Sequence, residues 1–254
     1  MRYAIIADIH GHLAALQAVV RDAEQQGCTH TACLGDIVGC FDKPKECVDL
    51  IRGMVIPCVK GNHDEYCATD MALDDFSLKG AANVAWTRQQ LSEDDCLWLR
   101  SLKLVDDLSG FTIVHAVLNE PGRWGYAFDQ LAAAASFAEQ KTPVCFFGHT
   151  HVPLSFVRGA TVGGGTYSKF YVESGKQYFV NVGSVGQPRD GTQGATYAIY
   201  DLENGTVELR RVECDRPGIP PTGAGDFPVP VKPVGPKPRS STPAKPEDQD
   251  FLTK

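Results

Sequence analysis

The chain has 254 residues, with 24 Lys and Arg against 31 Asp and Glu, a formal net charge of -7 and 43% hydrophobic residues. This is enough apolar material for a buried core, and the lack of any basic run argues against a nucleic-acid partner. The N-terminus lacks a signal-peptide core, and no 18-residue apolar segment follows it. A cytoplasmic protein without a membrane partner is therefore expected.

The first third of the chain alternates between apolar runs and helical patterns. The expected elements are strands at 2–7, 31–34 and beside Pro57 in 55–59, and helices at about 13–27 and 45–52. Strands that alternate with helices pair in parallel, so this region predicts an α/β sheet.

Residues 65–108 have a helical pattern and are expected to form an insertion. The elements expected after it are a strand at 111–115, a helix at 128–139, a strand at 144–147, and two hairpins, 167–172 with 177–182 and 195–201 with 207–212. Two sheets packed face to face with helices outside are the natural assembly of these elements.

The C-terminal 40 residues, 215–254, hold 10 of the 16 prolines. Such a composition does not bury enough apolar surface to offset the entropy lost on ordering, which predicts an extended, largely disordered tail after a folded domain at 1–214. The nine cysteines lack the paired spacing of a zinc site, and packing as reduced thiols is favoured over chemistry.

Candidate metal ligands follow five of the apolar runs. The strings are Asp8-Ile-His10, Gly35-Asp36, Gly61-Asn62-His63-Asp64, Gly148-His149-Thr-His151, and the lone His115 that ends FTIVH. Five of only seven histidines fall in these strings. Because strand ends converge on the ligand crevice of an open α/β sheet, these residues are expected to meet.

The spacing of His149 and His151 favours two ions over one. Along an extended chain, residues two apart lie about 6 to 7 Å from each other, which suits two ions about 3.5 to 4 Å apart. Asp36 is a candidate bridging ligand between the two ions. Asp8 and His10 would supply an oxygen and a nitrogen ligand to one ion, and Asn62 would supply a neutral oxygen ligand to the other. Nitrogen and oxygen ligands without thiolate suit Mn, Fe or Zn, with Mn favoured.

The charge of such a centre indicates the substrate. The positive charge of two divalent ions exceeds the negative charge of two aspartates and a bridging hydroxide, which leaves the centre with a net positive charge. An anionic, phosphate-type substrate therefore fits. The hydroxide would attack phosphorus in line, and His63, next to a ligand but free to turn outward, is placed to protonate the leaving oxygen.

The ordered motifs D-x-H, G-D, G-N-H-D, H and G-H-x-H resemble those of the calcineurin-like metallophosphoesterase superfamily over residues 1 to about 212. The resemblance implies a four-layer αββα sandwich of two mixed β-sheets flanked by helices. It also implies a dinuclear centre, with Asp8, His10, Asp36 and His151 on one metal and Asp36, Asn62, His115 and His149 on the other. In that scheme His63 is the general acid and Asp64 its neighbour behind the ligands.

The string NVGSVGQPRDG, residues 181–191, resembles a signature of the small bacterial branch associated with diadenosine tetraphosphatase and phosphodiesterase activities. Its glycines either admit backbone N–H groups to a phosphate or make a tight turn, and Arg189 is a candidate phosphate clamp. The loop that holds Arg123, Trp124 and Tyr126 has two possible roles. Its aromatic side chains could stack on a base while Arg123 contacts a phosphate, or they could simply pack against the protein, and packing is favoured.

These features together predict a metal-dependent hydrolase of a small phosphorylated or nucleotide substrate, either a phosphodiester or a dinucleoside polyphosphate. A phosphomonoesterase or serine/threonine-type protein phosphatase is the alternative, weakened because no Asp-Arg pair follows Gly35-Asp36. A non-catalytic scaffold on the same fold is disfavoured because every ligand position is intact. The oligomeric state is open, a homo-oligomer included.

Overall fold

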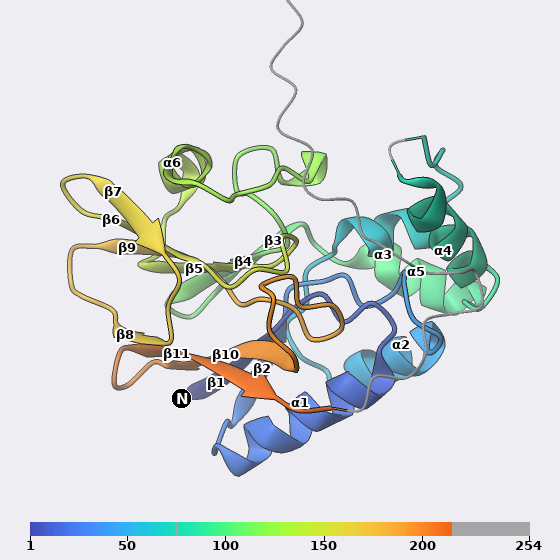
Figure 1. Cartoon of the computed structure of the whole chain (residues 1–254), viewed down its shortest axis with the longest axis horizontal. Coiled ribbons are helices and arrows are strands. Elements are labelled where there is room, and N and C mark those ends of the chain that lie inside the picture. The colour runs from blue at the N-terminus through green and yellow to red at the C-terminus, as the bar shows by residue number, and fades with distance from the viewer. Residues whose placement is uncertain (75, 215–254) are drawn as a thin grey trace, which may run out of the picture. The chain divides into compact units, whose positions relative to one another are not determined.

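The computed structural model describes residues 1–74 and 76–214, all within one compact unit. The proline-rich tail predicted at 215–254 lies outside the described residues. Two β-sheets face each other, with helices on the outer side of each (Figure 1). The four-layer αββα arrangement is therefore confirmed. Within the described residues, no helix is long and apolar enough to cross a bilayer.

The first sheet has five strands and mixed pairing. Its order is β2 (His30–Cys33), β1 (Arg2–Ile6), β10 (Ala195–Asp201), β11 (Thr206–Val212) and β8 (Lys169–Tyr171). The β1–β2 pair is parallel, as the strand–helix–strand pattern predicts, and β10 and β11 form the expected antiparallel hairpin.

The second sheet has six strands. Its order is β3 (Val105–Leu108), β4 (Phe111–Val114), β5 (Val144–Phe147), β9 (Gln177–Asn181), β6 (Ser155–Arg158) and β7 (Val162–Gly165). The central strands β4, β5 and β9 are parallel, and the flanking strands are antiparallel to their neighbours. The carboxyl ends of β4 and β5 therefore lie at one edge.

Helices cover both sheets. The first sheet carries α1 (Leu13–Gln25) and α2 (Pro44–Gly53), and the second carries α6 (Gln130–Glu139), as Figure 1 shows. The segment 65–108, expected as a helical insertion, contains α4 (Leu78–Arg88), α5 (Glu93–Ser101) and the end of α3 (Asn62–Cys67), which begins before it. A 3-10 turn spans Pro121–Arg123.

Strand β1 shows why the core forms three separate layers. Ala4 and Ile6 pack into the cluster beneath α1 and α2, whereas Ile5 and Ala7 pack into the cluster between the sheets. Side chains of a strand alternate between faces, so a strand covered on both sides reads as a continuous apolar run. The third cluster includes Phe137 of α6 and lies over the outer face of the second sheet.

Several local predictions are wrong. The segments 167–172 and 177–182 do not form a hairpin, because β8 pairs with β11 in one sheet and β9 pairs with β5 and β6 in the other. The sequence does not predict the hairpin β6–β7, and residues 105–108 at the end of the helical insertion form the strand β3. The run at 55–59 contributes only isolated bridges at Cys58 and Val59.

A charged cluster joins α1 to the first sheet. The carboxylate of Asp22 accepts hydrogen bonds from Tyr197 Oη at 2.6 Å and from Arg210 Nη2 at 3.1 Å. Partial burial alone would raise the pKa of Asp22, but the hydrogen bonds from Arg210 and Tyr197 outweigh it and lower the pKa. The charged form of Asp22 therefore stabilises the fold.

We expect Asp22→Asn to reduce the free energy of unfolding in urea by about 1 to 3 kcal/mol at pH 7, because a charge-assisted bond to Arg210 becomes a neutral one. A depressed folded-state pKa contributes stability that is present above the unfolded value, about 3.9, and is lost as the pH falls through the folded value. The difference from wild type should therefore shrink below about pH 4. Glu24→Gln, an exposed change on the same helix, is the control, and equal stabilities of wild type and Asp22→Asn would contradict this account.

Candidate metal centre

The predicted ligands stand where four strands end. Asp8 follows β1, Asp36 follows β2, His115 directly follows β4, and His149 follows β5. Backbone hydrogen bonds join neighbouring ends within each sheet, from Gly148 N to His115 O at 2.8 Å and from Asp8 N to Gly35 O at 3.0 Å. Between the two sheets, His149 N donates to Asp8 Oδ2 at 3.0 Å. The structure therefore brings the predicted ligands together at the strand ends, as the sequence analysis expects.

Five of the predicted ligands have left-handed backbone conformations. Their φ values are 55° at Asp8, 56° at His10, 53° at Asp36, 65° at His149 and 60° at His151. Residues other than glycine rarely adopt this region, and they do so chiefly where the surrounding structure enforces it. The prediction that His149 and His151 share an extended chain is therefore wrong, because two turns of the backbone bring these side chains to the centre.

The first ligand cluster contains Asp8, His10, Asp36 and His151, whose donor atoms all lie within 4.8 Å of one another. The Nε2 atoms of His10 and His151 are 3.0 Å apart. His10 Nε2 lies 3.6 Å from Asp36 Oδ2, and His151 Nε2 lies 3.5 Å from Asp8 Oδ1. All four side chains are buried.

The second cluster contains Asp36 again, with His115 and His149. His115 Nε2 lies 3.2 Å from His149 Nδ1, 3.4 Å from Asp36 Oδ2 and 3.3 Å from Asn62 Oδ1. Asn62 is thus the neutral oxygen donor of this group. The Oδ2 atom of Asp36 faces histidines of both clusters, the position that a shared ligand requires.

Backbone carbonyls fix the four imidazoles. Each ring places one nitrogen near a main-chain oxygen: His10 with Val38 at 3.3 Å, His115 with Leu34 at 2.7 Å, His149 with Trp124 at 2.9 Å, and His151 with Gln187 at 2.7 Å. Such a bond places the N–H on that nitrogen and turns the lone pair of the other nitrogen to the centre. Four oriented lone pairs and two carboxylates thus face one another.

This arrangement fits divalent cations. Two ligand atoms that bind the same ion, each at about 2.1 Å, lie roughly 3.0 to 3.4 Å apart. The paired imidazole nitrogens match this spacing, at 3.0 Å between His10 and His151 and 3.2 Å between His115 and His149. Burial raises the pKa of Asp8 to about 8. Burial acts against the charge on His115, but the carboxylate of Asp36 dominates and raises the pKa of His115 to about 10. Both groups would release a proton on binding a cation, because a ligand binds in its deprotonated form.

Asp64 lies behind the ligands. Its carboxylate accepts hydrogen bonds from the backbone N–H groups of Asp36, Ile37 and Gly61 at 2.8 to 3.0 Å. It therefore fixes the loop that carries Asp36 and the start of α3. The sequence groups Asp64 with His63 as a catalytic pair, with Asp64 as the neighbour behind the ligands, and these contacts agree with a positioning role for Asp64.

His63 lies beside the first cluster without belonging to it. Its backbone N–H donates to Asp36 Oδ1 at 2.8 Å, and its ring meets the ring of His10 edge to face at 4.7 Å. Its Nδ1 is buried against Gly39, where a Cβ atom would clash with it. Nε2 is therefore the nitrogen available to a substrate, as a general acid next to a ligand requires.

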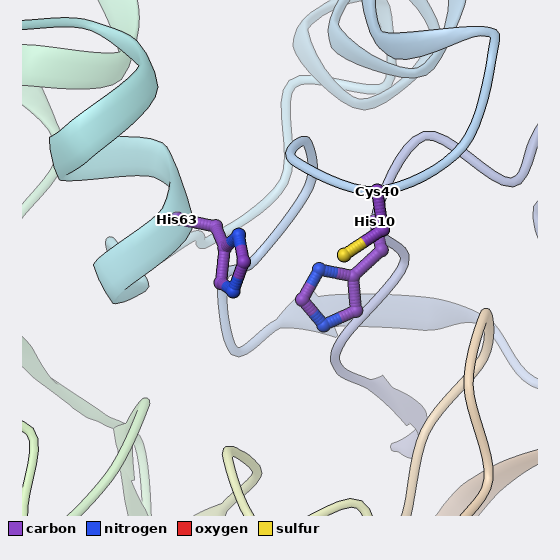
Figure 2. Close-up of side chains that lie close together, drawn as sticks. All are labelled: His10, Cys40 and His63. Carbon is purple, nitrogen blue, oxygen red and sulfur yellow. The ribbon is translucent and has the colours of Figure 1, made fainter. Parts of the chain in front are cut away.

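Cys40 is the residue at this site that the sequence did not indicate. Figure 2 shows its sulfur beside the rings of His10 and His63, and donor atoms of the three lie within 4.8 Å of one another. Burial raises the pKa of the Cys40 thiol to about 12, so it packs here as a neutral group. The sequence predicts that the cysteines pack as reduced thiols, and no spacing in it indicates this contact.

The glycine-rich string at 181–191 supports the centre from behind. The N–H groups of Val185 and Gly186 donate to Ala7 and Asp8 carbonyls at 2.9 Å, and Arg189 N donates to His151 O at 3.1 Å. A side chain at Gly186 would overlap the carbonyl of Ile9. Of the two alternatives left by the sequence, the structure therefore favours a tight turn, since these amides are already bonded within the protein.

The two arginines predicted to bind substrate differ in position. The charge of Arg189 acts on His151, whose pKa lies well below its usual range through burial first and Arg189 second. The backbone N–H of Arg189 donates to the carbonyl of His151 at 3.1 Å, so this residue lies beside the first cluster. The side chain of Arg123 is 79% exposed and pairs with Glu120 at 3.2 Å, so the structure places it at the surface.

Comparison with known proteins agrees with this geometry. A family model of the calcineurin-like phosphoesterase superfamily domain matches residues 1–205. The chain belongs to this superfamily. The protein MJ0912 of Methanocaldococcus jannaschii is 37% identical over 218 residues, which are 84% of this chain and 87% of that protein.

Two solved structures have the same fold. The crystal structure of a metallophosphoesterase from Sphaerobacter thermophilus is 36% identical, covers 85% of this chain and 90% of its own, and has a TM-score of 0.76. PH1004 from Pyrococcus horikoshii OT3 is 20% identical, covers 85% and 89%, and has a TM-score of 0.67. The resemblance of the five motifs to the superfamily is confirmed, and the chain is a metal-binding phosphoesterase.

Proposed function

We propose that this phosphoesterase hydrolyses a phosphodiester or a dinucleoside polyphosphate with two divalent metal ions. Asp8, His10 and His151 would hold one ion, Asn62, His115 and His149 the other, and Asp36 both. The observation that carries this proposal is the position of Asp36 Oδ2, 3.6 Å from His10 Nε2 and 3.4 Å from His115 Nε2. One carboxylate oxygen facing both clusters is the arrangement expected of a bridging ligand.

The donor set agrees with the expected metals. It consists of imidazole nitrogen and carboxylate or amide oxygen, which suit Mn, Fe and Zn, with Mn favoured. When bound, such ions polarise a phosphoryl oxygen and lower the pKa of water enough for attack on phosphorus near neutral pH. A centre of net positive charge selects an anionic substrate.

The chain's own residues complete the reaction. His63 Nε2 delivers a proton to the leaving oxygen, and the burial of Nδ1 against Gly39 keeps the ring in the orientation that this transfer needs. Arg189 attracts the anionic substrate to the side of the centre next to His151. Asp64 keeps Asp36 in place through the backbone of residues 36–38.

The diester preference rests on the three residues after Asp36. The segment Ile37-Val38-Gly39 is apolar and carries no second cation for the dianionic end of a phosphomonoester. A diester carries one negative charge at phosphorus and needs less positive charge. The phosphomonoesterase alternative has no such observation in its favour.

Turnover of bis-p-nitrophenyl phosphate and p-nitrophenyl phosphate tests this proposal, with the Mn-loaded protein against a chelator-stripped sample. We expect the diester to be the better substrate, activity to vanish on stripping, and Mn to restore it. Preference for the monoester would replace the diester assignment with the phosphatase alternative. Activity that survives complete stripping would refute the metal-dependent mechanism.

A further inference from the structure

Two exposed aromatic side chains lie beside the second ligand cluster. Tyr126 is 55% exposed and Phe128 is 38% exposed, and both belong to the segment between the 3-10 turn and α6. Their rings are parallel to within 8°, with centroids 5.8 Å apart. Ala127 between them is buried in the core beneath α6, so the segment presents both rings on its outer side.

The ring of Tyr126 is part of the site. It stacks on the imidazole of His149, with centroids 4.2 Å apart and an interplanar angle of 27°. The carbonyl of Trp124, two residues earlier, bonds the outer nitrogen of the same imidazole at 2.9 Å. The aromatic segment is thus fixed to a metal-ligand candidate at two points and has little freedom to move away from it.

Tyr126 therefore places an exposed aromatic surface next to a candidate metal ligand, at the edge of a centre that attracts phosphate.

We infer that the rings of Tyr126 and Phe128 stack on a nucleobase, so that the substrate is a nucleotide phosphoester bound with its base on the His149 side. The inference rests on the proposed function and specifies its substrate class. Because Tyr126 touches a ligand side chain, a base placed there is separated from a phosphate at the centre by little more than a sugar. Stacking of a base on an aromatic side chain is worth about 1 to 3 kcal/mol and tolerates different bases.

The test compares two substrates that share the scissile bond and the leaving group. These are the p-nitrophenyl ester of adenosine 5′-phosphate and methyl p-nitrophenyl phosphate, assayed with the Mn-loaded full chain. The ratio of their kcat/KM values isolates the contribution of the nucleoside, because any disturbance of the metals affects both substrates. We expect Tyr126→Ala and Phe128→Ala each to lower this ratio about 5- to 100-fold.

Matched variants separate stacking from other effects. Tyr126→Phe keeps the ring and should keep the ratio, whereas Tyr171→Ala removes a similarly exposed tyrosine on β8 (68% exposed) and should change nothing. Titration calorimetry of adenosine 5′-phosphate against methyl phosphate, with the same variants, measures the same preference without turnover.

The outcomes are distinct. A ratio unchanged by both alanine variants, from a protein that hydrolyses both esters, would overturn the base-stacking inference and leave the proposed function standing. A metal-loaded wild type that cleaves neither ester would instead refute the proposed function. A change in oligomeric state on size-exclusion chromatography, with the ratio unchanged, would assign the two rings to an interface between copies and also overturn the inference.

Discussion

Asp36→Asn should remove both metal ions and lower diester turnover on the order of 10³-fold or more, to the level of the metal-stripped protein. The substitution keeps the size of the side chain, and the amide oxygen can still accept the hydrogen bond that His63 N donates to Asp36 Oδ1 at 2.8 Å. The variant loses the second oxygen, which faces His10 and His115. A single change therefore affects both clusters.

Metal content by mass spectrometry is the direct measurement, because it does not depend on activity. The wild type should hold two equivalents per chain after loading with Mn and desalting, and Asp36→Asn should hold neither ion. Asp49→Asn, on the exposed side of α2, should keep both. Retention of two equivalents by the Asp36 variant would refute the bridging assignment.

His63→Ala should slow substrates with poor leaving groups far more than those with good ones. General acid catalysis contributes about 10²- to 10⁴-fold where the leaving oxygen needs a proton, as for an alkoxide. A p-nitrophenolate leaves without that help, so its rate should fall less than about tenfold. The ring of His63 touches His10 but is outside both ligand clusters, and the metal content should therefore be unchanged.

A series of diesters with leaving groups of increasing pKa measures this effect as the slope of log kcat/KM. The slope should steepen in His63→Ala and stay at the wild-type value in His30→Ala, which alters an exposed histidine at the start of β2. Equal losses across the series, or a loss of metal in the His63 variant, would remove its role as the acid.

The parts of the fold that the sequence predicted are those with strong local patterns. The β1–α1–β2 unit and the β10–β11 hairpin have apolar runs of the expected period with glycine at the turns. The ligand motifs lie at strand ends because an α/β sheet brings such ends together. Their convergence required only the order of the elements.

The wrong predictions of strand pairing have a common cause: the partner of a strand depends on tertiary packing, which a local sequence pattern does not contain. The Ser-Gly-Lys turn at 174–176 has the composition of a hairpin, yet the strands beside it belong to different sheets. Strand β7 reads VGGG, and Val162 is its only residue of the β-branched or aromatic type that is typical of strands. Likewise, Tyr126 contacts His149, which is 23 positions further along the chain, and no local sequence pattern predicts this contact.

The left-handed backbone at the ligands places activity and stability in competition. A non-glycine residue held in that conformation costs about 1 to 2 kcal/mol, and five ligand positions are held so. Glycine at such a position would relieve the strain while abolishing the ligand. Selection for a more heat-resistant chain would therefore tend to erase the centre, whereas selection for turnover retains residues that the free backbone disfavours. The metal-bound protein should be the more stable form, since ions that bind only the folded chain offset this cost.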